Sequence, residues 1–208
     1  PVALLSYNNS KWRTNKLIGG LFGEVDFGKF SKALEGLTFR STFGGEYSMV
    51  MNDSYTPEYY LDAMHFTTSD RASKSMQLYT RWNFENIFTY SRRIDVHNFT
   101  LMAGTTAYKD MYENLSASKA DLIFDDFEHS YIDNATDPES VDAGGGYSEH
   151  TVASLFARLN YDLMDRYMLT ATVRRDGSSR FGDENKYGIF PSASLGWVIS
   201  REPFMANL

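Results

Sequence analysis

The stretch of sequence with the greatest capacity for chemistry runs from Val173 to Lys186 and reads VRRDGSSRFGDENK. A serine nucleophile needs a positioned base and, in many hydrolases, a strained Gly-x-Ser-x-Gly turn. Neither surrounds Ser178 or Ser179, so we predict no catalytic residue here. The pair Asp176–Gly177 instead indicates a turn, held by hydrogen bonds between arginine and aspartate side chains.

A glycine-rich segment, IGGLFGEVDFG at Ile18–Gly28, resembles parts of a protein kinase but lacks the rest. Ile18 replaces the first glycine of the kinase motif, and the Asp-Phe-Gly triplet is fused to the same segment. The chain also contains no His-Arg-Asp triplet. We therefore expect the glycines to thin a strand near packed neighbours, and we predict no enzymatic activity.

Metal and cofactor sites are not predicted either. The chain has no cysteine, and its histidines (His65, His97, His129 and His150) form no pair at metal-ligand spacing. The acidic run Phe124–Gly146 lacks the spacing of an EF-hand, so we interpret it as a solvated loop.

Three tyrosines, Tyr55, Tyr59 and Tyr60, gather beside Pro57. Exposed tyrosines stack on sugars or contact a partner, whereas tyrosines turned inward pack a loop on itself. Both interpretations stay open at this point.

The composition excludes some classes of protein. A net charge of −7 argues against a nucleic-acid binder, whose affinity depends on excess lysine and arginine. No run approaches the roughly 20 apolar residues of a transmembrane helix, but a transmembrane β-strand needs only about 10 alternating residues. Because the chain begins with Pro1, we expect a mature chain or an internal piece of a longer one.

Period-two alternation predicts strands. It occurs in seven segments: Leu17–Phe27, Leu37–Met49, Gln77–Tyr90, Val96–Tyr108, Val152–Leu163, Arg166–Arg174 and Tyr187–Ile199. No segment predicts a convincing amphipathic helix. The expected connections alternate between short ones, such as Leu163–Asp165, and long polar ones at Val50–Met76, Met111–Thr151 and Arg175–Lys186. An outer-membrane barrel has this alternation of short turns and long loops.

Each predicted strand has one apolar and one polar face. The polar faces carry charges of both signs: Glu24, Asp26, Arg40, Glu46, Arg81, Glu85, Arg158, Asp162 and Arg174. The apolar faces tend to end in Tyr or Trp, as in the aromatic girdles of membrane barrels. A soluble β-sandwich with a wet outer face shows a similar pattern, so the pattern alone leaves barrel and sandwich open.

One long stretch resembles a known family residue by residue and not only in its alternation. The run FARLNYDLMDRYMLTATVRRDGSSRFGDENKYGIFPSASLGWVISREPFM, Phe156–Met205, resembles a signature of SusC/RagA-like TonB-dependent transporters of the outer membrane. Trp82–Tyr108 is a softer match to a barrel hairpin of this family, and Gly36–Tyr47 is a weaker one. The segments Val50–Met76 and Met111–Ser148 match no pattern of the family, so the choice of substrate is expected to lie there.

The resemblance implies an all-β fold, part of an antiparallel transmembrane barrel of about 22 strands. Residues 1–208 would supply seven strands with long outer loops, while a plug domain and the other strands lie elsewhere. The connection after Arg174 would be an outer turn that braces the barrel wall, with Arg175, Asp176, Gly177 and Arg180 in structural roles.

The implied function is active import of an oligosaccharide or peptide across the bacterial outer membrane. Implied partners are a SusD-like surface lipoprotein, TonB acting through the plug, membrane lipid and the substrate, but no nucleic acid, metal or cofactor. Candidate substrate-binding residues, in the lumen or the outer loops, are Arg40, Arg81, Glu85, Arg158, Arg174, Tyr55, Tyr59 and Tyr60. The alternatives are a siderophore or cobalamin receptor without a lipoprotein lid and a soluble β-sandwich glycan-binding module.

Overall fold

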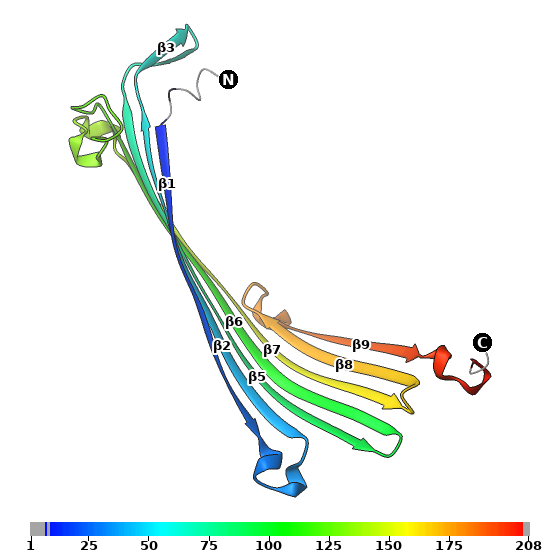
Figure 1. The fold of residues 1–208 in the computed structure, drawn as a ribbon. Coiled ribbons are helices and arrows are strands. Elements are labelled where there is room, and N and C mark those ends of the chain that lie inside the picture. The colour runs from blue at the N-terminus through cyan, green and yellow to red at the C-terminus, as the bar shows by residue number, and fades with distance from the viewer. Residues whose placement is uncertain (1–6, 8, 206–208) are drawn as a thin grey trace. The chain divides into compact units, whose positions relative to one another are not determined.

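The structure is a computed structural model that describes residue 7 and residues 9–205. Over these residues, seven strands form one antiparallel sheet in the order β1-β2-β5-β6-β7-β8-β9 (Figure 1). Their bounds are β1 Asn9–Asp26, β2 Leu37–Thr56, β5 Arg71–Ile94, β6 His97–Ala120, β7 Asp142–Leu163, β8 Tyr167–Ser178 and β9 Tyr187–Trp197. A small hairpin, β3 Tyr59–Asp62 and β4 His65–Thr67, lies between β2 and β5.

The remaining regular structure consists of single 3-10 turns in the connections. They are η1 Phe27–Lys29, η2 Lys32–Leu34, η3 Ile132–Asn134, η4 Pro138–Ser140, η5 Asp183–Asn185, η6 Ile199–Arg201 and η7 Pro203–Met205. Within the part of the chain that the structure describes, no helix is long and apolar enough to cross a membrane. Apart from the β3–β4 hairpin, the described residues form no second sheet, so they do not form the two-sheet β-sandwich of the alternative interpretation.

All seven predicted strands are present in the predicted order, but most are longer than predicted. The expected loops Val50–Met76 and Met111–Thr151 are shorter, because β2, β5, β6 and β7 all extend into them. In these extensions the residues are largely polar, so no apolar alternation marks them. The backbone ladder between neighbouring strands satisfies their N–H and C=O groups instead.

Five of the long strands pass through two compact units, which we describe separately. The loop unit comprises residues 9–18, 46–80 and 111–149, and the sheet unit comprises residues 19–45, 81–110 and 150–205. The loop unit contains the two longest connections, 57–70 and 121–141, and the sheet unit contains the connections 27–36, 95–96, 164–166 and 179–186.

The three last strands of the sheet unit have a regular register. Leu155 pairs with Arg175, which pairs with Ile189, and Tyr167 pairs with both Leu163 and Trp197. Because side chains alternate across a strand, this register places the odd-numbered residues of β7, β8 and β9 on one face. That face is almost wholly apolar, while Ser154, Arg158 and their even-numbered neighbours form a polar face.

Several positions in the connections of the sheet unit have positive φ angles. Met164 and Asp165 connect β7 to β8 with φ angles of 57° and 54°, which is typical of a type I′ hairpin turn. Gly36 has a φ of 87°, and a Cβ there would collide with the backbone oxygen of Ser91, so glycine is required.

A buried carboxylate closes the turn end of β8 and β9. Glu202 accepts hydrogen bonds from the Tyr167 hydroxyl at 2.6 Å, the Trp197 indole N–H at 3.0 Å and Arg166 at 3.2 Å. The hydrogen bonds from Tyr167 and Trp197, together with Arg166, lower the pKa of Glu202 below the ordinary value of a glutamate. We name Glu202, Arg166, Tyr167 and Trp197 the Glu202 hub.

The loop unit has a small core of its own. Tyr55, Ala72, Leu122 and Ala135 are buried together, with Phe127 and Ile132 packed against them. These residues come from the end of β2, the start of β5 and the connection after β6, so the core ties that connection to the strands.

Candidate functional site

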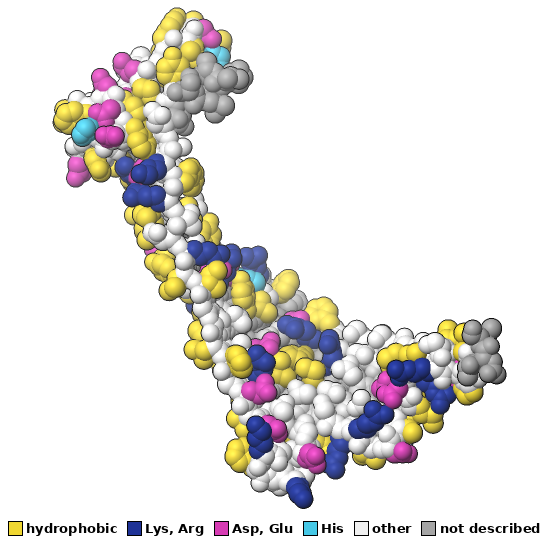
Figure 2. Space-filling model, in the orientation of Figure 1, with side chains coloured by type: hydrophobic (Ala, Val, Ile, Leu, Met, Phe, Trp, Pro, Cys, Tyr) yellow, Lys and Arg dark blue, Asp and Glu magenta, His cyan; other side chains and the backbone are white. Residues whose placement is uncertain are grey.

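The polar face of the sheet unit is the best candidate for a surface that contacts a solute, and several of its charges are paired. The shortest pairs join Arg81 Nε to Asp110 Oδ1 at 2.8 Å and Arg174 Nε to Asp176 Oδ1 at 2.6 Å. Figure 2 shows basic and acidic side chains lying next to one another on the visible surface. A wall of alternating charge of this kind offers hydrogen bonds without a strong net attraction for either sign.

The remaining predicted residues of this face have weaker or neutral partners. Arg40 lies 3.6 Å from Glu24 and stacks over the ring of Phe22 at 4.2 Å. Arg158 donates to the Thr172 hydroxyl at 3.2 Å, and Glu85 has no ion pair among the residues that the structure describes. The structure therefore brings Arg158 and Arg174 onto one polar face, each held by neighbours on the next strand.

The expected tyrosine cluster is not one surface. Tyr55 is only 3% exposed and belongs to the small core of the loop unit, so its interpretation as an exposed sugar-stacking ring is wrong. It is buried because β2 continues to Thr56 and turns this ring toward Ala72 and Leu122. Tyr59 stacks on Tyr7 with ring centroids 5.3 Å apart.

Tyr60 is the tyrosine of this group that stays open to a ligand. It is 71% exposed and tilts against the ring of Phe66 across the β3–β4 hairpin at 6.0 Å. An exposed pair of rings on a hairpin tip suits contact with a sugar or with a protein partner.

The predicted outer turn also begins later than expected. Arg175, Asp176 and Gly177 belong to β8, because their backbone pairs with β7 and β9 through Ser178. Arg175 stacks over the Tyr187 ring at 4.1 Å, and the same ring covers the open side of Gly177. Of the four predicted turn residues, only Arg180 lies in the connection itself, where its backbone N–H donates to Ser178 Oγ at 3.3 Å.

The loop unit contains a groove that the sequence did not predict. It has a volume of about 750 Å³, and its lining includes Lys11, Arg13, Asp53, Lys74 and Tyr131. Asp53 accepts from Arg13 at 2.6 Å and from Lys74 at 3.1 Å, and Lys74 also lies 5.2 Å from the centre of the Tyr131 ring. Four separate segments contribute these residues, so no motif in the sequence could have indicated the groove.

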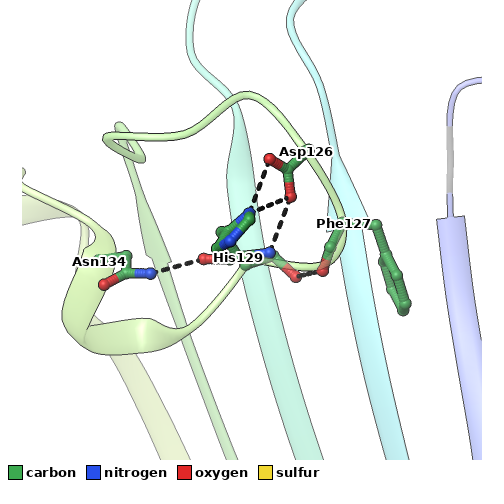
Figure 3. A network of polar contacts seen from close by, with 5 residues as sticks. Asp126, Phe127, His129 and Asn134 are labelled. Carbon is green, nitrogen blue, oxygen red and sulfur yellow. Dashed lines mark hydrogen bonds and ion pairs between the residues drawn. The ribbon is translucent and has the colours of Figure 1, made fainter.

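The connection between β6 and β7 that borders this groove has its own polar network (Figure 3). Asp126 accepts from the backbone N–H of His129 at 2.8 Å and from its ring Nδ1 at 2.9 Å. Asn134 donates to the His129 carbonyl at 2.8 Å, while Phe127 points away from these groups (Figure 3). These hydrogen bonds from His129 lower the pKa of Asp126.

The same arrangement, an aspartate that accepts hydrogen bonds from the histidine three residues later, occurs in the hairpin between β3 and β4. There Asp62 accepts from the backbone N–H of His65 at 3.0 Å and from its Nδ1 at 2.9 Å. Both histidines thus serve as turn formers. No cluster of three or more metal-ligating side chains occurs among the residues that the structure describes.

Comparisons with known proteins agree with this architecture. The family model described as "TonB dependent receptor-like, beta-barrel" matches residues 3–204. TonB-dependent receptor P39 of Formosa agariphila is 33% identical over 85% of this chain, and TonB-dependent receptor SusC of Bacteroides thetaiotaomicron is 28% identical over all of it. The chain spans 17% and 19% of the lengths of these two relatives.

Among solved structures, the RagAB peptide transporter matches 96% of this chain with a TM-score of 0.83 and 19% identity. The RagAB peptide importer in its open-open state matches 90% of the chain with a TM-score of 0.76. The chain covers 21% and 20% of those two structures, and at this level of identity the likeness concerns the fold.

Proposed function

Because this chain belongs to the family of TonB-dependent receptor-like β-barrels, we propose that it forms part of the wall of a transporter that imports an oligosaccharide or peptide across the outer membrane. The observation that carries the proposal is the division of the sheet into an apolar and a polar face. The apolar face of β7–β9 would meet lipid, and the polar face with its paired arginines would line the lumen.

The paired charges suit passage better than capture. A solute that moves along the polar face exchanges hydrogen bonds with side chains such as Arg81 and Arg174, whose charges are already balanced by Asp110 and Asp176. Tight binding would instead fall to the exposed groups of the loop unit, including the ring of Tyr60 and the groove at Lys74. In this mechanism the protein does no chemistry on the substrate.

The proposed partners follow the relatives. A SusD-like surface lipoprotein would cover the outer mouth and trap the substrate, and TonB would pull on a plug domain to open the path. The two states, lid open and lid closed, make this a gated binding device that is driven from outside. RagAB, whose structure this chain resembles, is a peptide transporter, which supports a peptide as the substrate, and the resemblance of the sequence to SusC/RagA-like transporters supports an oligosaccharide as well.

The direct test is co-purification of the full protein from outer membranes in mild detergent. We expect a surface lipoprotein at a stoichiometric level. A barrel that purifies without one would favour a siderophore or cobalamin receptor of the same fold. Recovery in the soluble fraction would overturn the proposal.

A paired substitution tests which face meets lipid. Leu159→Lys places a charge on the apolar face of β7, and Asn160→Lys places the same charge on the polar face one residue later. We expect Leu159→Lys to destabilise the barrel by about 2–4 kcal/mol and Asn160→Lys to cost much less. Equal stability of the two variants in lipid would contradict the assignment of the faces.

A further inference from the structure

One arginine lies on the apolar face. In the paired region of β7, β8 and β9, Arg175 shares its face with uncharged residues alone. They are Ala153, Leu155, Ala157, Leu159, Tyr161, Leu163, Tyr167, Leu169, Ala171, Val173, Gly177, Tyr187, Ile189, Pro191, Ala193, Leu195 and Trp197. The sequence predicts a turn at Arg175, and a charged side chain is common in a turn. In the structure Arg175 lies in β8, and a charge on a strand face that meets lipid is unusual.

Arg175 is exposed and has no ion pair among the residues that the structure describes. Its neighbour Arg174, on the polar face, bonds to both Asp176 and Ser154. The guanidinium of Arg175 lies over the face of the Tyr187 ring, with its Cζ 4.1 Å from the ring centre, which orients the planar group but leaves its donors open.

A shallow groove of about 300 Å³ adjoins this guanidinium. Its side chains on this face are Phe84, Thr105, Ala107, Ala153, Leu155 and Tyr187, with no carboxylate among the lining residues. Apart from the hydroxyl of Thr105, these side chains are apolar or aromatic, and the guanidinium of Arg175 supplies a cation at the β8–β9 end of the groove. A surface of this chemistry can take an acyl chain and an anion together.

The depth of Arg175 in a membrane can be derived from the strand. Tyr187 and Trp197 mark the two ends of the apolar face of β9, ten residues apart. At about 3.4 Å per residue and a tilt of about 40°, these ten steps span roughly 26 Å, close to the apolar band of about 25 Å in outer-membrane barrels. Both aromatic residues then lie at membrane interfaces, and Arg175 lies at the interface of Tyr187, away from the short turns.

We propose that Arg175 and the groove beside it bind a phosphate-bearing lipid of the outer leaflet, with the phosphate on the guanidinium and an acyl chain along the groove. The proposal rests on the outer-membrane location in the proposed function, which places the short turns on the inner side. A guanidinium gives two parallel hydrogen bonds to a phosphate, and these bonds are strongest where water is partly excluded. Gly177 contributes by allowing the Tyr187 ring to lie flat beside Arg175.

The test uses the full protein in detergent, titrated with lipid A that carries two phosphates and with the same lipid after dephosphorylation. For Arg175→Ala we expect the affinity for the phosphorylated lipid to fall about tenfold or more, as for loss of charged hydrogen bonds, and the affinity for the dephosphorylated lipid to stay. Arg175→Lys should keep part of the preference, because the charge remains but the paired donors are lost. Equal affinity of native protein for both lipids would overturn the proposal.

Two controls sharpen the test. Arg174→Ala removes the neighbouring charge from the opposite face and should leave lipid affinity unchanged; an equal loss there would mean a general charge effect and would overturn the proposal. Inorganic phosphate should compete only weakly, because it cannot use the groove. If phosphate alone displaced the lipid at comparable concentration, the site would be one for a free anion and the lipid assignment would be wrong.

The proposed function and this inference can fail separately. If the protein resides in the outer membrane with its lipoprotein but shows no preference for phosphorylated lipid, only the lipid site is wrong. If the protein is soluble, the proposed function fails and the lipid site fails with it.

Discussion

Two carboxylates are withdrawn from solvent to nearly the same extent, and their surroundings differ. Glu202 of the sheet unit is 7% exposed, and Asp70 of the loop unit is 6% exposed. Glu202 accepts from three side chains of the Glu202 hub. Asp70 accepts from the backbone N–H of Leu122 at 2.8 Å through one oxygen, while its other oxygen has no hydrogen-bond partner within the described chain.

The difference extends to the neighbours of each carboxylate. Burial and the nearby Asp70 carboxylate raise the pKa of Tyr55, yet Tyr55 and Asp70 form no hydrogen bond of good geometry. The side-chain oxygen of Asn52, in the same strand as Tyr55, also lacks a hydrogen-bond partner among the described residues. A buried polar atom without a partner costs free energy, whereas a satisfied one is close to neutral. At the turn end of the sheet unit the buried carboxylate is hydrogen-bonded by side chains of the same unit, whereas the loop unit retains buried polar atoms that form no hydrogen bond of good geometry.

The largest effect is expected from Glu202→Ala. Removal of the carboxylate leaves Arg166, Tyr167 and Trp197 without their common acceptor, so the turn end of β8 and β9 loosens. We expect several-fold less folded protein in the outer membrane, measured by heat-modified migration of the full protein on gels.

Glu202→Gln serves as the matched control, because its amide oxygen can still accept from Tyr167 or Trp197. We expect an intermediate loss. If Glu202→Ala folds to the native level, the Glu202 hub does not stabilise the turn end, and the contrast drawn between Glu202 and Asp70 is wrong.

A smaller effect is expected at Asp70. Asp70→Ala leaves the Leu122 N–H buried and unpaired, which should cost about 1–3 kcal/mol locally. Asp70→Asn keeps an oxygen for this N–H and should cost less. The measurement is protection of the segment 121–141 from hydrogen exchange in the full protein, and equal losses in the two variants would contradict the assigned hydrogen bond.

The effect of pH on the stability of the segment 121–141 should be smaller than the effect of Asp70→Ala. Hydrogen bonds from His129 lower the pKa of Asp126, so the carboxylate binds its proton less readily in the folded loop than in an unfolded one. Its stabilisation is present above the unfolded pKa and is lost as the pH falls through the lower, folded pKa. We expect exchange protection of the segment, corrected for intrinsic rates, to drop a few-fold below about pH 4.

In Asp126→Asn this pH response should disappear, since no titratable group remains at that position. A native-like drop in the variant would assign the pH dependence to another group of the loop.

The smallest effect is expected from Tyr55→Phe, which removes a buried hydroxyl that lies beside the Asp70 carboxylate without a hydrogen bond of good geometry. Loss of an unsatisfied polar atom from a core is neutral or slightly stabilising. Thermal stability should therefore stay at the native level or rise. A clear loss of stability would show that the hydroxyl has a partner in the full protein, such as a bound water or another segment.

Much of the sheet could be predicted, and little of its side-chain pairing. Alternation located all seven strands, yet the polar extensions, such as residues 111–120 of β6, carried no apolar signal and were interpreted as loops. Arg175 was assigned to a turn because Asp176–Gly177 is a common turn pair, but the ladder with β7 and β9 continues through both residues. The pattern around Pro57 indicated a loop and left open whether Tyr55 is exposed or packed inside it; the structure buries it.

The sequence by itself determined the seven strand segments, the two faces of the strands and the family, because alternation and the signature at Phe156–Met205 are local properties of the chain. Only the tertiary structure decided that Glu202 gathers three donors, that Lys74 shares Asp53 with Arg13, and that Arg175 stands alone among apolar neighbours. The physical reason is the register between strands. The alternation along a strand tells which face a side chain occupies, but the register with the neighbouring strand, tens of residues away in the sequence, decides which side chain lies beside it.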